Sequence, residues 1–166
     1  MKRGQMKLSF GMIFSIILII FFVAFAFFAI NKFVGIQKSI EVGQFSDELE
    51  SVVNKMWQGS QGSQALELRL PKKIQLVCFG DYRIEAEARG QNEDLFDDLT
   101  IAFYENENLI FYPIGSGEGL DAINVEHLDI EKMTERDNPL CFKNEDGKVK
   151  MVVKKEFEEA LVTISR

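Results

Sequence analysis

Few residues of this 166-residue chain have types and spacings that could do chemistry. His127 is the only histidine, and its neighbours in "NVEHLDI" complete neither a catalytic triad nor a metal site. We therefore expect His127 to be a solvated or core-edge strand residue. Ser60, Ser63 and Ser116 lie in Gly-rich loops without a nucleophile-elbow pattern or a nearby base. The sequence predicts no catalytic residue and no enzyme activity.

The residues that could hold a metal ion or a phosphate also lack the necessary patterns. The acidic run 93–98 lacks the alternating ligands, central Gly and closing Glu of a helix-loop-helix calcium site. This run contains Glu93, Asp94, Asp97 and Asp98. The segment "GSGEGLD" at 115–121 has close glycines, but no Lys-Ser/Thr follows and its own acids would repel a phosphate. We predict solvated turns, no bound metal and no cofactor.

The chain's two cysteines are the one pair whose chemistry the sequence favours. Cys78 ends the apolar stretch "IQLVC" and Cys141 lies in "LCF", so both are expected to face one small core. In an oxidising compartment such a pair forms a disulfide, with Cα atoms about 4.4 to 6.8 Å apart. The alternative is two buried free thiols that fill space.

A long apolar segment precedes all of these residues. No charged residue occurs from Leu8 to Ile30, and a helix of that length covers about 34 Å, enough to cross a hydrocarbon core of about 30 Å. We predict a basic cytoplasmic leader at 1–7 and a transmembrane helix at 8–31, against the alternative of a wholly buried helix. Basic residues before the span favour a cytoplasmic N-terminus and an extracytoplasmic C-terminal part in a cell membrane.

The charge distribution limits the partners of that C-terminal part. All acidic residues follow the apolar segment, and the chain beyond position 32 has a net charge of about −11. Such a surface repels phosphate backbones and anionic headgroups, so no nucleic-acid partner is expected.

Within the apolar segment, Gly11 and Ser15 form a small-xxx-small pair that allows another helix to approach closely. The many Phe residues of the span suit either a helix bundle or lipid. Helical spacing of apolar residues continues beyond the span and predicts an amphipathic helix at 32–58. "GSQGSQ" at 59–64 is predicted to be a linker.

From residue 65 onward the apolar period changes to two, which is typical of strands. We predict strands in "ALELRL", "IQLVCF", "YRIEAEAR" and "INVEHLDI", and a hairpin from "LTIAFY" to "LIFYP". A second hairpin turns at Asp146-Gly147, and "ALVTI" forms a final strand. The predicted fold class is α+β: a long N-terminal helix followed by a mainly antiparallel β-rich domain at 65–166.

"KRGQ" before a long apolar helix resembles the class III signal peptide of archaeal type IV pilin-like proteins. This resemblance implies that a prepilin peptidase cleaves between Gly4 and Gln5 and that the helix can form a filament core. Lys7 and the absence of a Glu in the first helical turn depart from the family's pattern. The stretches "MW...SQGSQ", "LPKKI.LVCF" and "ALVTI" are also similar to uncharacterised single-span proteins of small-genome archaea, a likeness that implies no activity.

These observations lead to two functional hypotheses. The first is a structural or adhesive subunit of the pilin or pseudopilin type, which forms a homo-oligomer or filament through its N-terminal helix. The alternative is an unprocessed membrane-anchored module that presents its β-domain to another partner.

Overall fold

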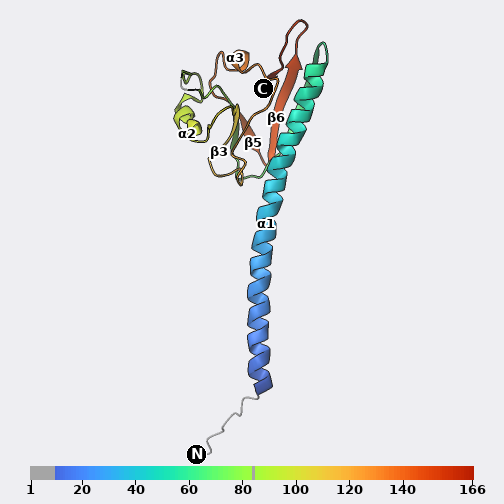
Figure 1. Cartoon of the computed structure of the whole chain (residues 1–166), viewed down its shortest axis with the longest axis vertical. Helices are drawn as coiled ribbons and strands as arrows, with labels where there is room; N and C mark the ends of the chain where they lie inside the picture. Colours follow the sequence, from blue (N-terminus) through green and yellow to red (C-terminus); the bar gives the residue numbers. More distant parts are fainter. Residues whose placement is uncertain (1–9, 84) are drawn as a thin grey trace, which may run out of the picture. The chain divides into compact units, whose positions relative to one another are not determined.

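The computed structural model describes residues 10–83 and 85–166, and the chain divides into two compact units, one up to Gln37 and one from Lys38 to Arg166 (Figure 1). Helix α1, Phe10–Gln58, is a single continuous element that belongs to both units. The segments predicted as a transmembrane helix and an amphipathic helix are therefore parts of one helix.

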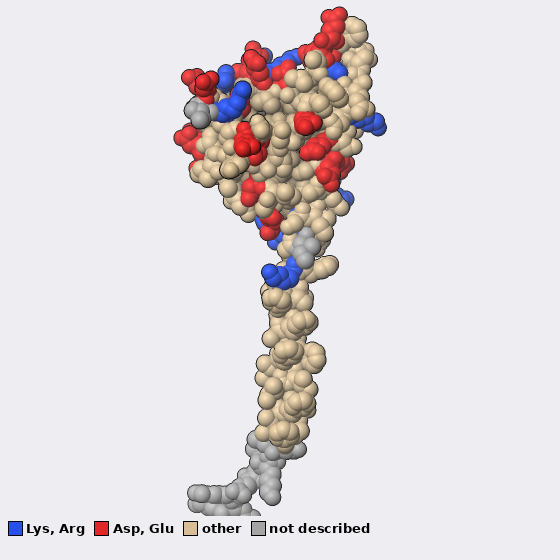
Figure 2. Space-filling view, in the orientation of Figure 1, with Lys and Arg blue, Asp and Glu red and all other residues tan. Residues whose placement is uncertain are grey.

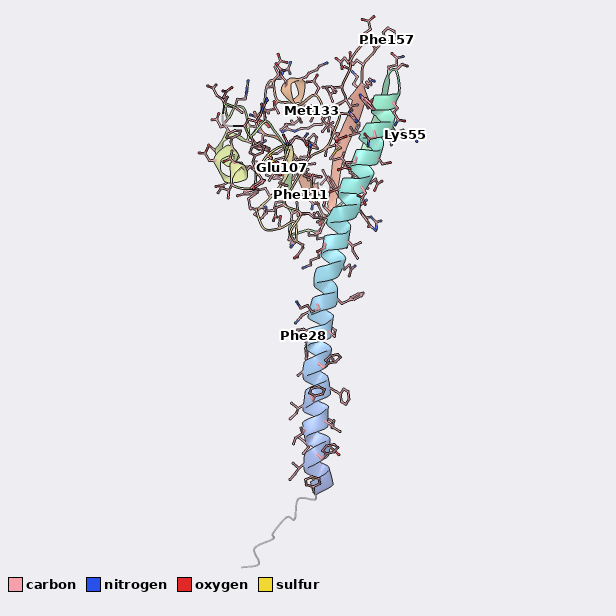
Figure 3. All side chains as sticks on the ribbon, viewed as in Figure 1. Phe28, Lys55, Glu107, Phe111, Met133 and Phe157 are labelled. Atoms are coloured by element: carbon pink, nitrogen blue, oxygen red, sulfur yellow. A yellow bond between two sulfur atoms is a disulfide. The ribbon has the colours of Figure 1, made fainter. Side chains whose placement is uncertain are left out.

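The first unit contains the apolar part of α1. Its large side chains are exposed along the whole segment, with 67% exposure at Phe27 and 61% at Phe28, which points away from the helix axis in Figure 3. No acidic or basic residue occurs from Phe10 to Ile30, and Figure 2 shows only other side chains along most of this part of the helix. The segment is long and apolar enough to cross a membrane.

In the second unit the same helix has a buried stripe. Val42, Phe45, Leu49 and Val53 are at most 2% exposed, at the three- and four-residue spacing of one helix face. They share one core with residues of the sheet, and the ring of Phe45 meets that of Phe111 edge-on, with centroids 5.6 Å apart. The predicted amphipathic character of this part of the helix is confirmed.

The rest of the second unit is built around one seven-stranded sheet in which all paired strands are antiparallel. The order is β1-β6-β5-β2-β3-β4, and β7 also pairs with β6. The strands are β1 Gly62–Arg69, β2 Leu76–Phe79, β3 Leu109–Tyr112, β4 Ala122–Ile123, β5 Leu140–Glu145, β6 Lys148–Lys155 and β7 Thr163–Ser165. The predicted α+β class is confirmed.

The two faces of the sheet have different covers. Val77 and Phe79 on β2 belong to the same core as the buried stripe of α1, which runs beside β6 in Figure 1. Cys78 lies between them, so it points to the opposite face. There it packs in a second, smaller cluster with Tyr82, Phe96 and Leu99. Two short helices belong to this second cover, η1 Glu93–Leu95 and α2 Phe96–Thr100, while α3, Ile130–Met133, lies later in the chain.

Several of the strand predictions are wrong. The described residues of 82–89 form no strand, because local contacts replace a sheet partner: Arg83 binds the Asp81 carboxylate, and Arg89 makes only an isolated bridge to Asn138. "LTIAFY" ends helix α2 and continues as turns instead of pairing with β3. "INVEHLDI" contributes only the last residue of β4 before its own turns.

The boundary of the β-rich part also differs from the prediction. Strand β1 begins at Gly62, inside the segment predicted as a linker, because its ladder with β6 starts at the pair Gly62 and Lys155. The connection after α1 is correspondingly short. Its helix end is held by Lys155, whose ammonium donates to the carbonyl oxygens of Trp57 and Gly59 at 2.6 and 2.9 Å.

Candidate functional site

The cysteine pair lies at the centre of the sheet. Cys78 on β2 and Cys141 on β5 occupy directly opposed positions of the ladder, and the structure joins them in a disulfide as the sequence predicts. Their Cα atoms are 4.0 Å apart, closer than the expected range, because opposed residues of antiparallel strands lie only about 4.5 Å apart where the ladder has no hydrogen bonds. Both cysteines are at most 5% exposed.

The second cover, the cluster of Tyr82, Phe96 and Leu99, packs against this disulfide. Tyr82 is 3% exposed and donates its hydroxyl to the Cys78 carbonyl oxygen at 3.2 Å. Burial raises the pKa of the Tyr82 hydroxyl, so Tyr82 is a neutral hydrogen-bond donor. Such burial is typical of a structural cross-link, since it hinders the approach of attacking thiolates to the sulfur atoms.

His127 is placed by a turn and not by a strand. Its backbone is left-handed, with φ at 65°, and its ring stacks on the indole of Trp57, with centroids 3.7 Å apart and planes 1° apart. The Nε2 atom lies 3.8 Å from a carboxylate oxygen of Glu126. Trp57 ends the amphipathic part of α1, so this stack joins the helix end to the loop after β4.

The other residues that the sequence singles out stay apart from one another. Asp97 and Asp98 lie in the first turn of α2, after Glu93 and Asp94 in η1. Within residues 10–83 and 85–166, no group of three or more His, Cys, Asp or Glu side chains is placed to hold a metal ion.

The Gly-rich loop at 115–121 binds its own carboxylate. The Gly117 N–H donates to Asp121 Oδ1 at 2.7 Å, so the loop's acid takes an amide that a phosphate would need. Ser116 is 6% exposed, and its hydroxyl has no partner in the described part of the chain. Among the described residues, no base is within hydrogen-bond distance of this hydroxyl to activate it as a nucleophile.

The predicted helix-packing pair lies in the exposed apolar part of α1. Ser15 Oγ donates to the Gly11 carbonyl oxygen at 2.8 Å, so the hydroxyl is satisfied inside its own helix. Both residues are exposed, and the packing of another helix against them stays a prediction. Gly4 and Gln5, the predicted processing site, lie outside the described residues.

A broad cleft of about 780 Å³ opens beside the second cover of the sheet. Its carboxylates come from Asp81, Glu85, Glu87, Glu105, Glu131 and Glu135, and its guanidinium groups from Arg83 and Arg89. Hydrogen bonds from Arg83 hold the pKa of the Asp81 carboxyl below its usual range. Among its described lining residues the cleft has neither a thiol nor an imidazole, and the Thr134 hydroxyl donates to the Ile130 carbonyl oxygen at 2.7 Å.

A second recess, of about 380 Å³, lies on the half of the sheet that the second cover leaves open. It contains the basic side chains of Lys143, Lys148, Lys150 and Arg166, a cluster that sequence reasoning missed. Its members are far apart in the chain, and only the alternation of exposed Lys148 and Lys150 in "GKVKMVV" indicates a charged strand face.

No protein-family model, curated protein or solved structure matches this chain.

Proposed function

We propose that this protein is a single-pass membrane protein whose C-terminal β-domain lies outside the cytoplasm. The observation that carries the proposal is the division of α1 into a part with exposed apolar side chains and no charge, and a part with a buried stripe and charged residues opposite. A 61% exposed Phe28 is unfavourable in water and favourable in lipid.

Two further observations support the orientation. Lys2, Arg3 and Lys7 precede the apolar segment, and basic flanks stay on the cytoplasmic side. The Cys78–Cys141 disulfide is of a type that persists in oxidising compartments and is rare in a reducing cytosol.

Within this membrane assignment we propose a structural or adhesive role as a pilin-like or pseudopilin subunit. An apolar half-helix, an amphipathic half-helix packed on an antiparallel sheet, and a Gly4-Gln5 pair after basic residues support this role. A prepilin peptidase is then a partner, and Gly11 and Ser15 provide the close-approach surface for a homo-oligomer or filament.

An unprocessed membrane-anchored binding module is the second candidate. The recess on the open half of the sheet favours it, because a purely structural subunit does not need basic side chains gathered against an acidic net charge of −7.

Extraction and topology measurements on the full chain test the membrane proposal. The protein should stay in the membrane pellet at alkaline pH, and protease added to intact cells should digest the β-domain. Replacing Ile19 and Val23 with Asp should release it, since each central charge costs about 3 kcal/mol. The control pair Phe157→Asp and Leu161→Asp, also exposed apolar residues, should remain membrane-bound. A soluble wild-type chain, or a protease-resistant domain in intact cells, would contradict the proposal.

A further inference from the structure

Along one edge, strand β6 pairs first with β5 and then with β7. The recess lies between these two pairings. Its first residues pair with β5, through Lys148 and Val149, and its later residues 152–154 pair with β7. On that side, Lys150 and Met151 have no ladder partner among the described residues. The sheet therefore forks between β5 and β6, which lie side by side in Figure 1.

Arg166, directly after β7, reaches across this fork. Its Nη2 donates to the carbonyl oxygen of Cys141 on β5 at 3.2 Å, and its Nη1 donates to Gln91 Oε1 at 3.3 Å. These contacts fix the guanidinium over the gap and beside the second cover, where Asn92 adds a side-chain amide to the recess. The remaining N–H groups of the guanidinium are available to an acceptor.

Alternation along the strands places the other basic side chains on this same face. Lys148 and Lys150 are exposed on β6, while Val149 and Met151 point into the core. Glu145 is paired with Lys148 in the β5–β6 ladder, so Lys143, two residues earlier, shares its face. Lys143 is exposed and is in no ion pair within the described residues.

Two lysines of the recess already bind a carboxylate of the protein itself. The Glu67 carboxylate lies against Lys148 at 2.5 Å and against Lys150 at 3.8 Å. The hydrogen bond from Lys148 holds the pKa of Glu67 below its usual range, so Glu67 is charged at neutral pH. The side chains of Lys143, Lys148, Lys150 and Arg166 carry four positive charges. Glu145 in the lining and Glu67 at its side carry two negative ones, so the side chains have an excess of two positive charges.

We propose that this recess binds a doubly charged tetrahedral oxyanion, that is, free phosphate or sulfate or a phosphate monoester. The fixed guanidinium and the lysine ammonium groups donate charge-assisted hydrogen bonds to its oxygen atoms. The excess of positive charge matches a dianion. The acidic surface elsewhere repels polyanions such as nucleic acid, so the ligand is a small free anion or one phosphate monoester on an otherwise neutral small molecule.

Isothermal titration of the full chain in a nonionic detergent, with inorganic phosphate as the probe, tests the site. We expect saturable binding that the double variant Lys143→Gln/Lys150→Gln weakens by at least about tenfold. Lys154→Gln is the matched control, because Lys154 is also an exposed β6 lysine, paired with Glu156 outside the recess. It should change the affinity less than about twofold.

A variant that removes a negative charge should change the phosphate affinity in the opposite direction. Glu67→Gln removes the carboxylate that competes for Lys148 and Lys150, so it should tighten phosphate binding by about threefold or more. No saturable binding by the wild-type chain, equal weakening by Lys154→Gln, or weaker binding by Glu67→Gln would each overturn the proposal.

A second titration distinguishes the two sources of the anion. A hexose monophosphate and inorganic phosphate are compared, with the unphosphorylated hexose as the blank, because a phosphate monoester is close to a dianion at neutral pH. Tighter binding of the hexose monophosphate supports an ester-borne group, and equal or tighter binding of inorganic phosphate supports the free ion. Binding of the unphosphorylated hexose with equal affinity would contradict an oxyanion site. If the recess does not bind an oxyanion, the proposed membrane assignment is unaffected, because it rests on the exposed apolar part of α1.

Discussion

The imidazole of His127 lies flat on the indole of Trp57, with centroids 3.7 Å apart and planes 1° apart. This stack connects the last turn of α1 to the loop that follows β4. In the described part of the chain no group of three or more side chains is placed to hold a metal ion, and the carboxylate beside His127 Nε2 is that of Glu126 at 3.8 Å. The contact is therefore a structural joint between the helix end and the domain that it covers.

Replacing His127 with Asn should weaken this joint without abolishing the fold. Asn tolerates the left-handed backbone at φ 65° but loses the stack, which should cost about 1 kcal/mol of unfolding free energy. Denaturation followed by the fluorescence of Trp57, the only tryptophan, measures the loss directly. The control Glu126→Gln keeps both rings and should change stability little. An unchanged emission spectrum in His127→Asn would refute the stack.

The disulfide should contribute much of the domain's stability. It closes a loop across 63 positions, which corresponds to about 4 kcal/mol in the chain-entropy model. Replacing both Cys78 and Cys141 with Ala should lower the unfolding free energy by about that amount. Denaturation of the full chain with and without reductant provides the check. Reductant should destabilise the wild-type chain alone, and an equal effect on the double variant would argue against the bridge.

Phe45 should be the most sensitive position of the buried stripe. It is 2% exposed and meets Phe111 edge-on, so Phe45→Ala should lose about 3 to 5 kcal/mol. Phe33, on the same helix but 69% exposed, is the matched control, and Phe33→Ala should leave the unfolding transition of the domain unchanged. Equal losses for the two variants would contradict the assignment of the core.

The Asp81–Arg83 pair predicts a loss of stability in acid. Because the hydrogen bond from Arg83 lowers the pKa of Asp81, its carboxylate stabilises the fold at neutral pH, and this contribution disappears as the pH falls below about 4. Asp81→Asn should be less stable than the wild-type chain at pH 7 and should show a shallower decline in acid. Asp146, 96% exposed beside Lys72, is the control position. Parallel pH profiles for wild-type and Asp81→Asn chains would contradict this role.

The sequence correctly predicts those elements whose apolar spacing matches the contacts that they make in the folded domain. The helix stripe at Val42, Phe45 and Leu49 and the hairpin at Asp146-Gly147 are both local signals that the tertiary structure reinforces. The alternation in "YRIEAEAR" misleads, because burying Tyr82 over the disulfide outweighs strand propensity when no neighbouring strand is available.

The basic recess could not be predicted from spacing along the chain. It depends on the exchange of β5 for β7 beside β6, which brings Arg166 next to Cys141. A pairing change of this kind is a tertiary event that leaves no periodic signal in the sequence. The disulfide was predictable because two cysteines allow only one pairing.

The structural role proposed for this protein rests on processing at Gly4-Gln5, which the mass of the native N-terminus tests most directly. Protein isolated from membranes of its own host should begin at Gln5, and Gly4→Val should block that maturation while Gly43→Ala, in an open helical position, should not. Native chains that all retain intact Met1 would contradict the pilin-like proposal and favour the anchored binding module.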